Sequence, residues 1–304
     1  MEDVIAVYEA LRPLMPSPMI SDPDSTITHP KSVRQLVEIL PEVDALFLDG
    51  FGVINVGQDP VDGIHEFLAE AEAQNVALMV LTNGASHGAE NSWAKYQKWG
   101  LTFVREQVVS SRDALTAELD NISSAVIIGS IDRVVTPLDR AGGVALANGD
   151  DVFNEAGLFA FLGATGWGED DQAALEAAIG KGNQPLYIAN PDVGAPFDGG
   201  FTNEPGYWAA RTIKATGVTT SWFGTPHRAI FDLTFARLEA FYNRKFERNR
   251  VAMVGDSLHT DILGASAAGL RSVLLTGYGL FRDGGAGEMI ERCKIYPDWI
   301  AATL

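Results

Sequence analysis

Residues 45–53 read Ala-Leu-Phe-Leu-Asp-Gly-Phe-Gly-Val, four apolar residues that run into an acid and two glycines. An apolar run without alternation is typical of a strand in a parallel sheet, because helices cover both of its faces. The acid, Asp49, would then lie at the carboxyl end of the strand, where open parallel sheets bind their ligands. Gly50 and Gly52 would let the backbone approach a ligand closely. Asp-Gly is also a common turn pair, so this stretch alone leaves both interpretations open.

Similar apolar runs recur along the chain and alternate with helical patterns. We predict strands at residues 45–48, 76–81, 125–128, 186–189, 251–254 and 272–275. This alternation predicts βα units around a parallel sheet, and therefore an α/β fold.

The length of the chain predicts two domains or one with an insertion. About 170 residues separate Thr82 from Asp256, more than the intervening βα units of one sheet need. We therefore expect a core domain at 43–89 and 221–304, with a second α/β domain inserted at 90–220. Residues 1–42 are predicted to be an appendage with an amphipathic stretch at 4–11, prolines that break regular structure between 13 and 30, and a helix at 32–40.

The composition excludes several classes of partner. The chain has 22 Lys and Arg against 40 Asp and Glu, a formal net charge of −18. This charge argues against nucleic acids and anionic membranes as partners, because both are bound through basic residues. With 46% hydrophobic and 20% charged residues, no basic leader and no run long enough to span a bilayer, we expect a globular cytoplasmic protein. The single cysteine, Cys293, is expected to be a small, buried or half-buried apolar residue.

Acidic residues follow two of the predicted strands. Asp49 ends the first, and Asp256 and Asp261 follow the strand at 251–254, ahead of a helix at 262–268 that Gly269 would end. One of these acids could simply cap the helix. Carboxylates that converge from different strands more naturally hold a hard cation, and Mg²⁺ is commonly bound by one or two carboxylates together with substrate phosphate. The sequence thus predicts a Mg²⁺ site.

Thr82, Asn83 and Gly84 follow the strand at 76–81. The threonine hydroxyl and the N–H groups of Asn83 and Gly84 could receive phosphate oxygens, although a threonine at a strand end is often only a turn former. Together, the strand ends offer a nucleophile, a phosphate-binding loop and a metal site.

These motifs resemble those of the haloacid dehalogenase superfamily: an Asp after strand one, Thr-Asn after strand two, and Gly-Asp-Ser-x-x-Thr-Asp after a later strand. The long insertion resembles the branch with an α/β cap, which includes sugar-phosphate, nitrophenyl-phosphate and pyridoxal-phosphate phosphatases. Further matches lie at 108–111, 189–192 and 223–227, and the resemblance covers residues 43–304. It implies a Rossmannoid parallel-sheet core with an inserted α/β cap, and a Mg²⁺-dependent phosphatase of a small phosphorylated metabolite.

The resemblance also implies roles for individual residues. Asp49 would be the nucleophile that forms an aspartyl-phosphate. Mg²⁺ would be held by Asp49, the main-chain carbonyl of Phe51 and Asp256, with Asp261 as a further or alternative ligand. Thr82 and the amide that follows it would bind the phosphoryl group.

Two positions depart from the family pattern. The resemblance implies a second Asp, the general acid, where this chain has Phe51, and a Lys where it has Thr225. A general acid contributes about 10² to 10⁴ in rate. His227 and Arg228 lie within three residues of Thr225 and are candidates for the missing positive charge, unless they are simply solvated surface residues.

His259 is a candidate proton donor if it points inward, although we expect it at the surface, and His87 leaves the same two interpretations open. Trp167, Trp208 and Trp222 are more typical of the core of the inserted domain than of a substrate pocket.

Three functions fit these residues: a phosphatase, a catalytically degenerate protein that binds a metabolite or protein partner, and a dehalogenase. Dehalogenation gains nothing from Asp256 and Asp261, whose charges would repel an anionic substrate. A purely binding protein has no need for Asp49, because an unpaired buried carboxylate is costly. The phosphatase is therefore favoured, and the appendage is a candidate for packing onto the core or against a second subunit in a homo-oligomer.

Overall fold

Residues 2–17, 30–131, 138, 143–145, 151–197 and 200–304 are described by the structure, a computed structural model. The chain folds into two compact units, which we name by their sheets. The small-sheet unit comprises residues 1–13, 83–91 and 110–224, and the large-sheet unit residues 14–82, 92–109 and 225–304. The predicted domain boundaries at 42, 89 and 220 stay predictions.

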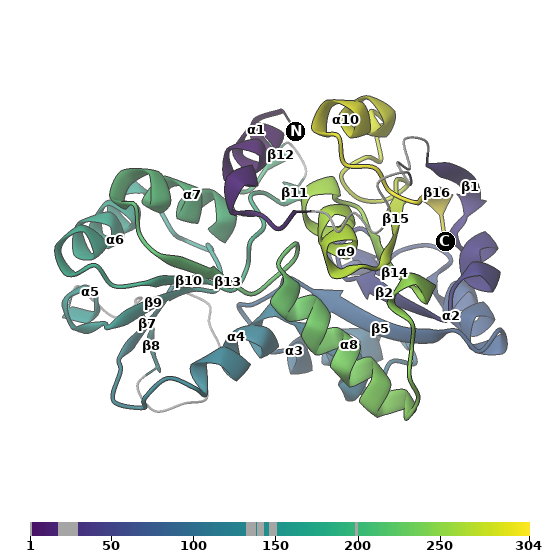
Figure 1. The fold of residues 1–304 in the computed structure, drawn as a ribbon, viewed down its shortest axis with the longest axis horizontal. Helices are drawn as coiled ribbons and strands as arrows, with labels where there is room; N and C mark the ends of the chain where they lie inside the picture. The colour runs from purple at the N-terminus through teal and green to yellow at the C-terminus, as the bar shows by residue number, and fades with distance from the viewer. Residues whose placement is uncertain (1, 18–29, 132–137, 139–142, 146–150, 198–199) are drawn as a thin grey trace. The chain divides into compact units, whose positions relative to one another are not determined.

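The large-sheet unit contains a sheet of seven described strands in the order β1-β16-β15-β14-β2-β5-β6 (Figure 1). The strands are β1 Lys31–Gln35, β2 Ala45–Asp49, β5 Ala77–Thr82, β6 Val108–Ser110, β14 Val251–Gly255, β15 Arg271–Leu275 and β16 Trp299–Thr303. The central strand β2 pairs in parallel with β14 on one side and β5 on the other. The carboxyl ends of these three strands therefore lie at one edge of the sheet.

Helices and short strands complete this unit. They are α2 Ile64–Ala73, most of α3 Ala89–Lys98, α8 Arg228–Tyr242, α9 Leu263–Ala268, α10 Ala286–Cys293, and the antiparallel pair β3 Asn55–Val56 and β4 Asp59–Pro60. Helix α8 packs against β5 and α9 on the same side of the sheet (Figure 1). Residues 45–48 are fully buried, as expected for a strand covered on both faces. Gly269 ends α9 with a φ of 73°, as predicted.

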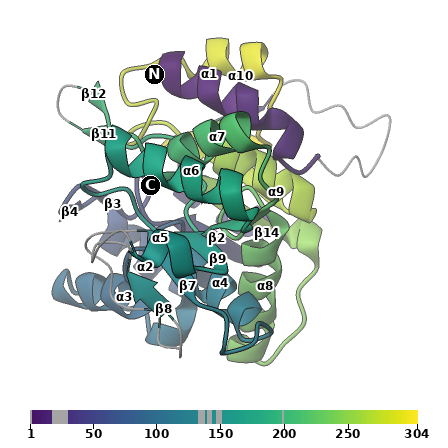
Figure 2. The same ribbon diagram turned by 90° about the vertical axis from the view of Figure 1, so that its left-hand side faces the viewer.

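The small-sheet unit contains a sheet of five described strands in the order β13-β10-β9-β7-β8. Strands β9, β7 and β8 of this sheet are labelled in Figure 2. The strands are β7 Ile128–Ile131, β8 Gly143–Ala145, β9 Leu158–Phe161, β10 Leu186–Ile188 and β13 Thr220–Trp222, with a separate pair β11 Pro196–Phe197 and β12 Gly200–Phe201. The helices are α1 Glu2–Leu11, α4 Ser111–Leu119, α5 Asp151–Glu155, α6 Glu169–Gly182 and α7 Pro205–Thr216. Helix α1 packs against α7, and the Tyr8 hydroxyl accepts the N–H of Val193 at 3.2 Å.

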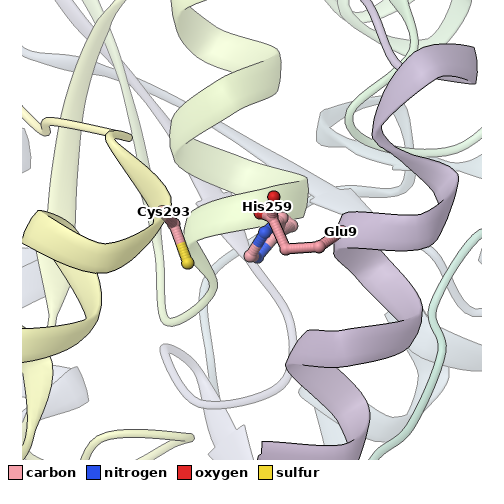
Figure 3. A group of neighbouring side chains, drawn as sticks. All are labelled: Glu9, His259 and Cys293. Atoms are coloured by element: carbon pink, nitrogen blue, oxygen red, sulfur yellow. The ribbon is translucent and has the colours of Figure 1, made fainter.

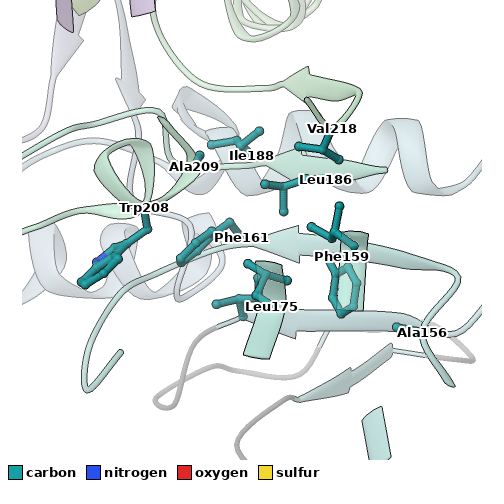
Figure 4. Packing of buried hydrophobic residues seen from close by; sticks show 11 residues of the cluster. Ala156, Phe159, Phe161, Leu175, Leu186, Ile188, Trp208, Ala209 and Val218 are labelled. Carbon is teal, nitrogen blue, oxygen red and sulfur yellow. The ribbon is translucent and has the colours of Figure 1, made fainter. Parts of the chain in front are cut away.

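The core of this unit fills the space between the sheet and helices α6 and α7 (Figure 4). Phe159 and Phe161 share one face of β9, because side chains two residues apart on a strand point the same way. Trp208 is buried among them, and Trp167 and Trp222 pack against the cluster. The prediction that these tryptophans belong to the core is confirmed.

Two sequence predictions are wrong in detail. Residues 32–40 are not an α-helix: β1 is followed by the 3-10 helix Leu36–Glu42, because β1 pairs with β16 from the far end of the chain. The strand predicted at 125–128 begins only at Ile128, since a turn closed by the N–H of Val126 on the carbonyl of Ser123 precedes it.

The remaining predictions concern the N-terminal residues and membrane-spanning segments. The amphipathic stretch at 4–11 is helix α1, whereas the prolines at 18 and 23 lie outside the described residues. Among the described helices, none combines the length and the apolarity that a membrane crossing requires.

Replacing Phe161 with Ala tests the core of the small-sheet unit. Because the ring is fully buried, we expect the free energy of unfolding to fall by about 3–5 kcal/mol. Urea denaturation followed by tryptophan fluorescence measures the change. The control Val104→Ala removes a side chain that is 42% exposed and should change the stability by less than about 0.5 kcal/mol. Equal effects of the two substitutions would contradict the assigned core.

Candidate active site

Three carboxylates meet at the carboxyl ends of strands β2 and β14. Asp49 ends β2, Asp256 directly follows β14, and Asp261 lies in the single turn of π-helix Leu258–Ile262. One carboxylate oxygen from each lies within 4.8 Å of those of the other two. Asp256 and Asp261 are buried and Asp49 is half-buried. The structure therefore brings together the three acids singled out by the sequence.

Backbone N–H groups hold each of these carboxylates. Asp49 Oδ1 accepts the N–H of Gly50 at 2.7 Å, and Asp256 Oδ2 accepts the N–H of Leu280 at 2.9 Å. Asp261 Oδ2 accepts the N–H of Ser257 at 3.0 Å. Hydrogen bonds to the ionised form stabilise it, so these contacts favour charged carboxylates in fixed orientations.

Glycines make room for the acids. A Cβ atom at Gly52 or at Gly279 would overlap the carboxylate of Asp256, and one at Gly255 would overlap Asp261. Gly52 also has a φ of 79°, a conformation that glycine adopts without strain. The sequence singled out Gly52, whereas Gly279 was missed because it reaches the site from the loop after β15.

Burial raises the pKa of Asp256 to about 6, and the N–H of Leu280 only partly opposes this rise. Ionisation of Asp256 is therefore unfavourable unless a cation lies beside the carboxylate. Three closely spaced carboxylates are the oxygen-rich donor set that divalent cations such as Mg²⁺ and Ca²⁺ prefer. The residues present thus fit a divalent metal.

Hydroxyl groups border the backbone next to Asp49. Thr82 ends β5, whose register pairs Leu81 with Asp49. A Cβ atom at Gly50 would lie 3.3 Å from Thr82 Oγ1 and 3.1 Å from Tyr96 Oη. Thr82 therefore lies on the strand adjacent to the acids, as its sequence position predicts.

The loop after Thr82 is anchored within the small-sheet unit. Asn83 donates from Nδ2 to Asp192 Oδ1 at 2.7 Å, and its carbonyl accepts the Ser111 hydroxyl at 3.0 Å. The buried Arg112 donates to the carbonyls of residues 85 and 86 at 3.2 and 3.1 Å. Gly84 is exposed. These contacts give a physical role to the sequence matches at 108–111 and 189–192, whereas Arg112 was missed.

The two cationic candidates near Thr225 have other surroundings. Burial lowers the pKa of His227 to about 4, so this imidazole is neutral at pH 7. Arg228 is exposed and pairs with Asp232 on its own helix, with Nε 2.8 Å from Oδ2. Their role as phosphate-binding residues stays a prediction.

The structure adds two residues on α3 that sequence reasoning missed, Lys95 and Tyr96. Burial lowers the pKa of Lys95, and the negative charge of Asp49 acts in the opposite direction. Burial, reinforced by Asp49, raises the pKa of Tyr96 well above its ordinary value, so this phenol stays neutral. No motif marks these residues, because only the fold brings α3 close to the end of β2.

The prediction that His259 lies at the surface is wrong, because this residue is only 1% exposed. Figure 3 shows its side chain together with that of Cys293, on the helical turn that leads into α9 and on α10 respectively. A ring nitrogen of His259 lies within 4.8 Å of Cys293 Sγ. Cys293 is buried, as predicted, and His87 is exposed.

Two family models match the chain. One is described as haloacid dehalogenase-like hydrolase and matches residues 46–143, and the other, described as HAD-hydrolase-like, matches residues 222–304. Together they include all three acids of the site.

Characterised relatives are similar over most of the chain. A D-glycerol 3-phosphate phosphatase of Mycobacterium tuberculosis is 28% identical over 260 residues, which cover 84% of this chain and 69% of that protein. An acid sugar phosphatase of Staphylococcus aureus is 24% identical over 243 residues, covering 77% of this chain and 86% of the relative.

Solved structures share the fold. A possible sugar phosphatase from Cytophaga hutchinsonii superposes with a TM-score of 0.77 at 23% identity, over 90% of this chain and 98% of that one. The glycerol phosphate phosphatase of Mycobacterium tuberculosis, solved in complex with calcium, gives a TM-score of 0.61 at 25% identity, over 80% and 68% of the two chains.

Asp256→Asn tests the charge balance of the metal-free site. The raised pKa means that ionised Asp256 destabilises the folded state; this cost is absent below about pH 4 and complete above about pH 6. In EDTA we therefore expect Asp256→Asn to be more stable than the parent above pH 6, by on the order of 3 kcal/mol. The difference should shrink towards zero near pH 4.

Urea denaturation between pH 4 and pH 8 measures this difference. Asp283→Asn, at a side chain that is 93% exposed, is the matched control and should show no such pH dependence. A constant difference between the parent and Asp256→Asn across this range would contradict the assigned environment.

Proposed function

The chain belongs to the haloacid dehalogenase-like hydrolases, and we propose that it hydrolyses phosphomonoesters of small metabolites with the help of a divalent cation. The observation that carries this proposal is the cluster of Asp49, Asp256 and Asp261 at the ends of adjacent strands. Glycerol phosphate and sugar phosphates are the substrate class that the names of the relatives suggest.

Asp49, Asp256 and Asp261 would hold the metal, for which we propose Mg²⁺, together with the main-chain carbonyl of Phe51. Bound there, the cation would supply positive charge that offsets the negative charge of the phosphoryl group.

In the proposed reaction, Asp49 is the nucleophile. Its carboxylate oxygen forms a bond to phosphorus while the bond from phosphorus to the ester oxygen breaks, and the electron pair leaves with that oxygen. Water then attacks the phosphorylated Asp49, which releases inorganic phosphate and restores the carboxylate. The hydroxyl of Thr82 and the N–H groups of Asn83 and Gly84 would bind the phosphoryl oxygens.

The leaving oxygen needs a proton, and Phe51 has none to give. Without a positioned acid, departure depends on the acidity of the leaving group, since a general acid contributes about 10² to 10⁴ in rate. We therefore expect aryl phosphates, whose phenolate leaves readily, to react much faster than alkyl phosphates.

Phe51 and Thr225 also support a second candidate function, a protein that binds a phosphorylated metabolite without turning it over. Both replace groups that a phosphatase of this family would use. The two functions share the metal site and the phosphate-binding loop, and they differ only in turnover.

Asp49→Asn tests the nucleophile. Because the amide cannot form the phosphoryl bond, we expect phosphate release to fall by more than about 10³-fold. The assay measures phosphate released from glycerol 3-phosphate, sugar phosphates and 4-nitrophenyl phosphate, with Mg²⁺ or with EDTA. Asp283→Asn is the control. Activity that survives in Asp49→Asn would remove this residue as nucleophile, and a parent protein that binds Mg²⁺ and phosphate but releases none would favour the binding function.

Phe51→Asp tests the missing proton donor. We expect it to raise kcat for glycerol 3-phosphate by at least about tenfold, with a much smaller gain for 4-nitrophenyl phosphate, whose leaving group needs little protonation. Phe51→Asn is the matched control, because the Asn side chain has the size of Asp but cannot act as a general acid. An equal gain with both substrates, or with both variants, would mean that position 51 acts through something other than proton transfer.

A further inference from the structure

We propose that Lys95 supplies the fixed positive charge that Thr225 does not provide, and that it binds the phosphoryl group at the carboxyl end of β2. This inference rests on the proposed function, since it concerns the same site. It adds to the site a residue of helix α3, which belongs to none of the motifs at the strand ends.

A chain of hydrogen bonds links Lys95 to the turn that follows Asp49. Lys95 Nζ donates to Asn55 Oδ1 at 3.1 Å, and Asn55 is only 3% exposed. The N–H of Asn55 donates to the carbonyl of Gly50 at 3.0 Å, and its carbonyl accepts the N–H of Gly52 at 2.8 Å. The ammonium group is therefore held against the turn between the nucleophile and the glycine that packs on Asp256.

Aromatic rings fix the position of this cation. Lys95 Nζ lies 5.5 Å from the ring centroid of Tyr96 and 5.2 Å from that of Trp99. Cation–π contacts at these distances hold an ammonium group more firmly when it is partly desolvated, as this half-buried side chain is. Tyr96 also borders Gly50 and Thr82, so the same helix contributes to the neighbourhood of the phosphate-binding hydroxyl.

The charge balance of the site explains why such a cation is needed. The three carboxylates carry more negative charge than one divalent cation neutralises, so a phosphate dianion would still meet net repulsion. Asp49 is the acid whose charge acts on Lys95. The other two candidates fit less well, because His227 is neutral at pH 7 and Arg228 is paired with Asp232.

Opposite effects on two ligands distinguish this role from a structural one. A cation next to the site attracts phosphate but repels Mg²⁺. Removing it should therefore weaken the binding of phosphate and strengthen the binding of Mg²⁺. A residue that merely supports Asn55 would, when removed, disorder the turn and weaken both.

The experiment measures the affinity of Mg²⁺ alone, and of inorganic phosphate in saturating Mg²⁺, by titration calorimetry. The variants are Lys95→Gln and Lys95→Met, the second of which keeps the aliphatic stem on the rings if the first does not fold. We expect phosphate to bind at least about tenfold more weakly and Mg²⁺ about threefold or more tightly. Lys95→Arg should keep phosphate affinity within about threefold of the parent, since the charge is retained. The exposed Lys98→Gln on the same helix is the matched control and should change neither affinity.

Three results would overturn the inference: both affinities unchanged in Lys95→Gln and Lys95→Met, both weakened together, or a loss in Lys95→Arg as large as in Lys95→Gln. Neither affinity depends on turnover. A parent protein that binds Mg²⁺ and phosphate but cleaves no ester would therefore contradict the proposed function while leaving the role of Lys95 to be decided by the variants.

Discussion

Repulsion between three carboxylates that the fold holds together is the constraint on which this site depends. Oxygen atoms of Asp49, Asp256 and Asp261 lie within 4.8 Å of one another, and two of these acids are buried. Such acids cannot all be ionised unless a cation compensates their charge; without one, at least one of them keeps its proton. Gly52, Gly255 and Gly279 pack directly against Asp256 and Asp261, where a larger residue would overlap the carboxylates. A divalent cation that binds the folded chain would relieve the repulsion, and metal binding would then be coupled to stability.

The sheet topology creates this arrangement. Strand β2 lies between β5, which follows it in the chain, and β14, which follows about 200 residues later. The strand order thus reverses at β2, and open α/β sheets bind ligands at such a reversal. Because β2 and β14 are neighbours in the sheet, the site forms only after the segment between them has folded or been looped out. Asp49 and the other two acids of the cluster consequently come from segments about 200 residues apart in the sequence.

The excess of acidic residues, which gives the chain a net charge of −18, includes the three carboxylates of this site. The acids attract a cation but repel an anionic ester, so each nearby positive group affects which ligand is favoured. Thr225 and Phe51 stand in place of groups with different roles in the proposed reaction. The Lys expected at position 225 would offset the charge of the bound phosphoryl group, whereas the Asp expected at position 51 would give a proton to the leaving group. A cation from α3 would compensate the first departure only. The two departures are therefore expected to affect phosphate affinity and leaving-group preference independently.

Local patterns in the sequence determined the strands predicted at 45–48, 76–81, 186–189, 251–254 and 272–275, the acids and Thr82 near the ends of three of them, the burial of Cys293 and the packing of three tryptophans in the core of the small-sheet unit. This was predictable because an unbroken apolar run marks a covered strand, and parallel strands in register bring their carboxyl ends to one edge. The tertiary structure alone decided that residues 31–35 form a strand, that His259 is buried, and that Lys95 meets Asn55 and Asn83 meets Asp192. The last two contacts join residues 40 and 109 positions apart, and β1 pairs with a strand near the other end of the chain. No local pattern encodes such pairings, because they depend on which elements the completed fold places next to each other.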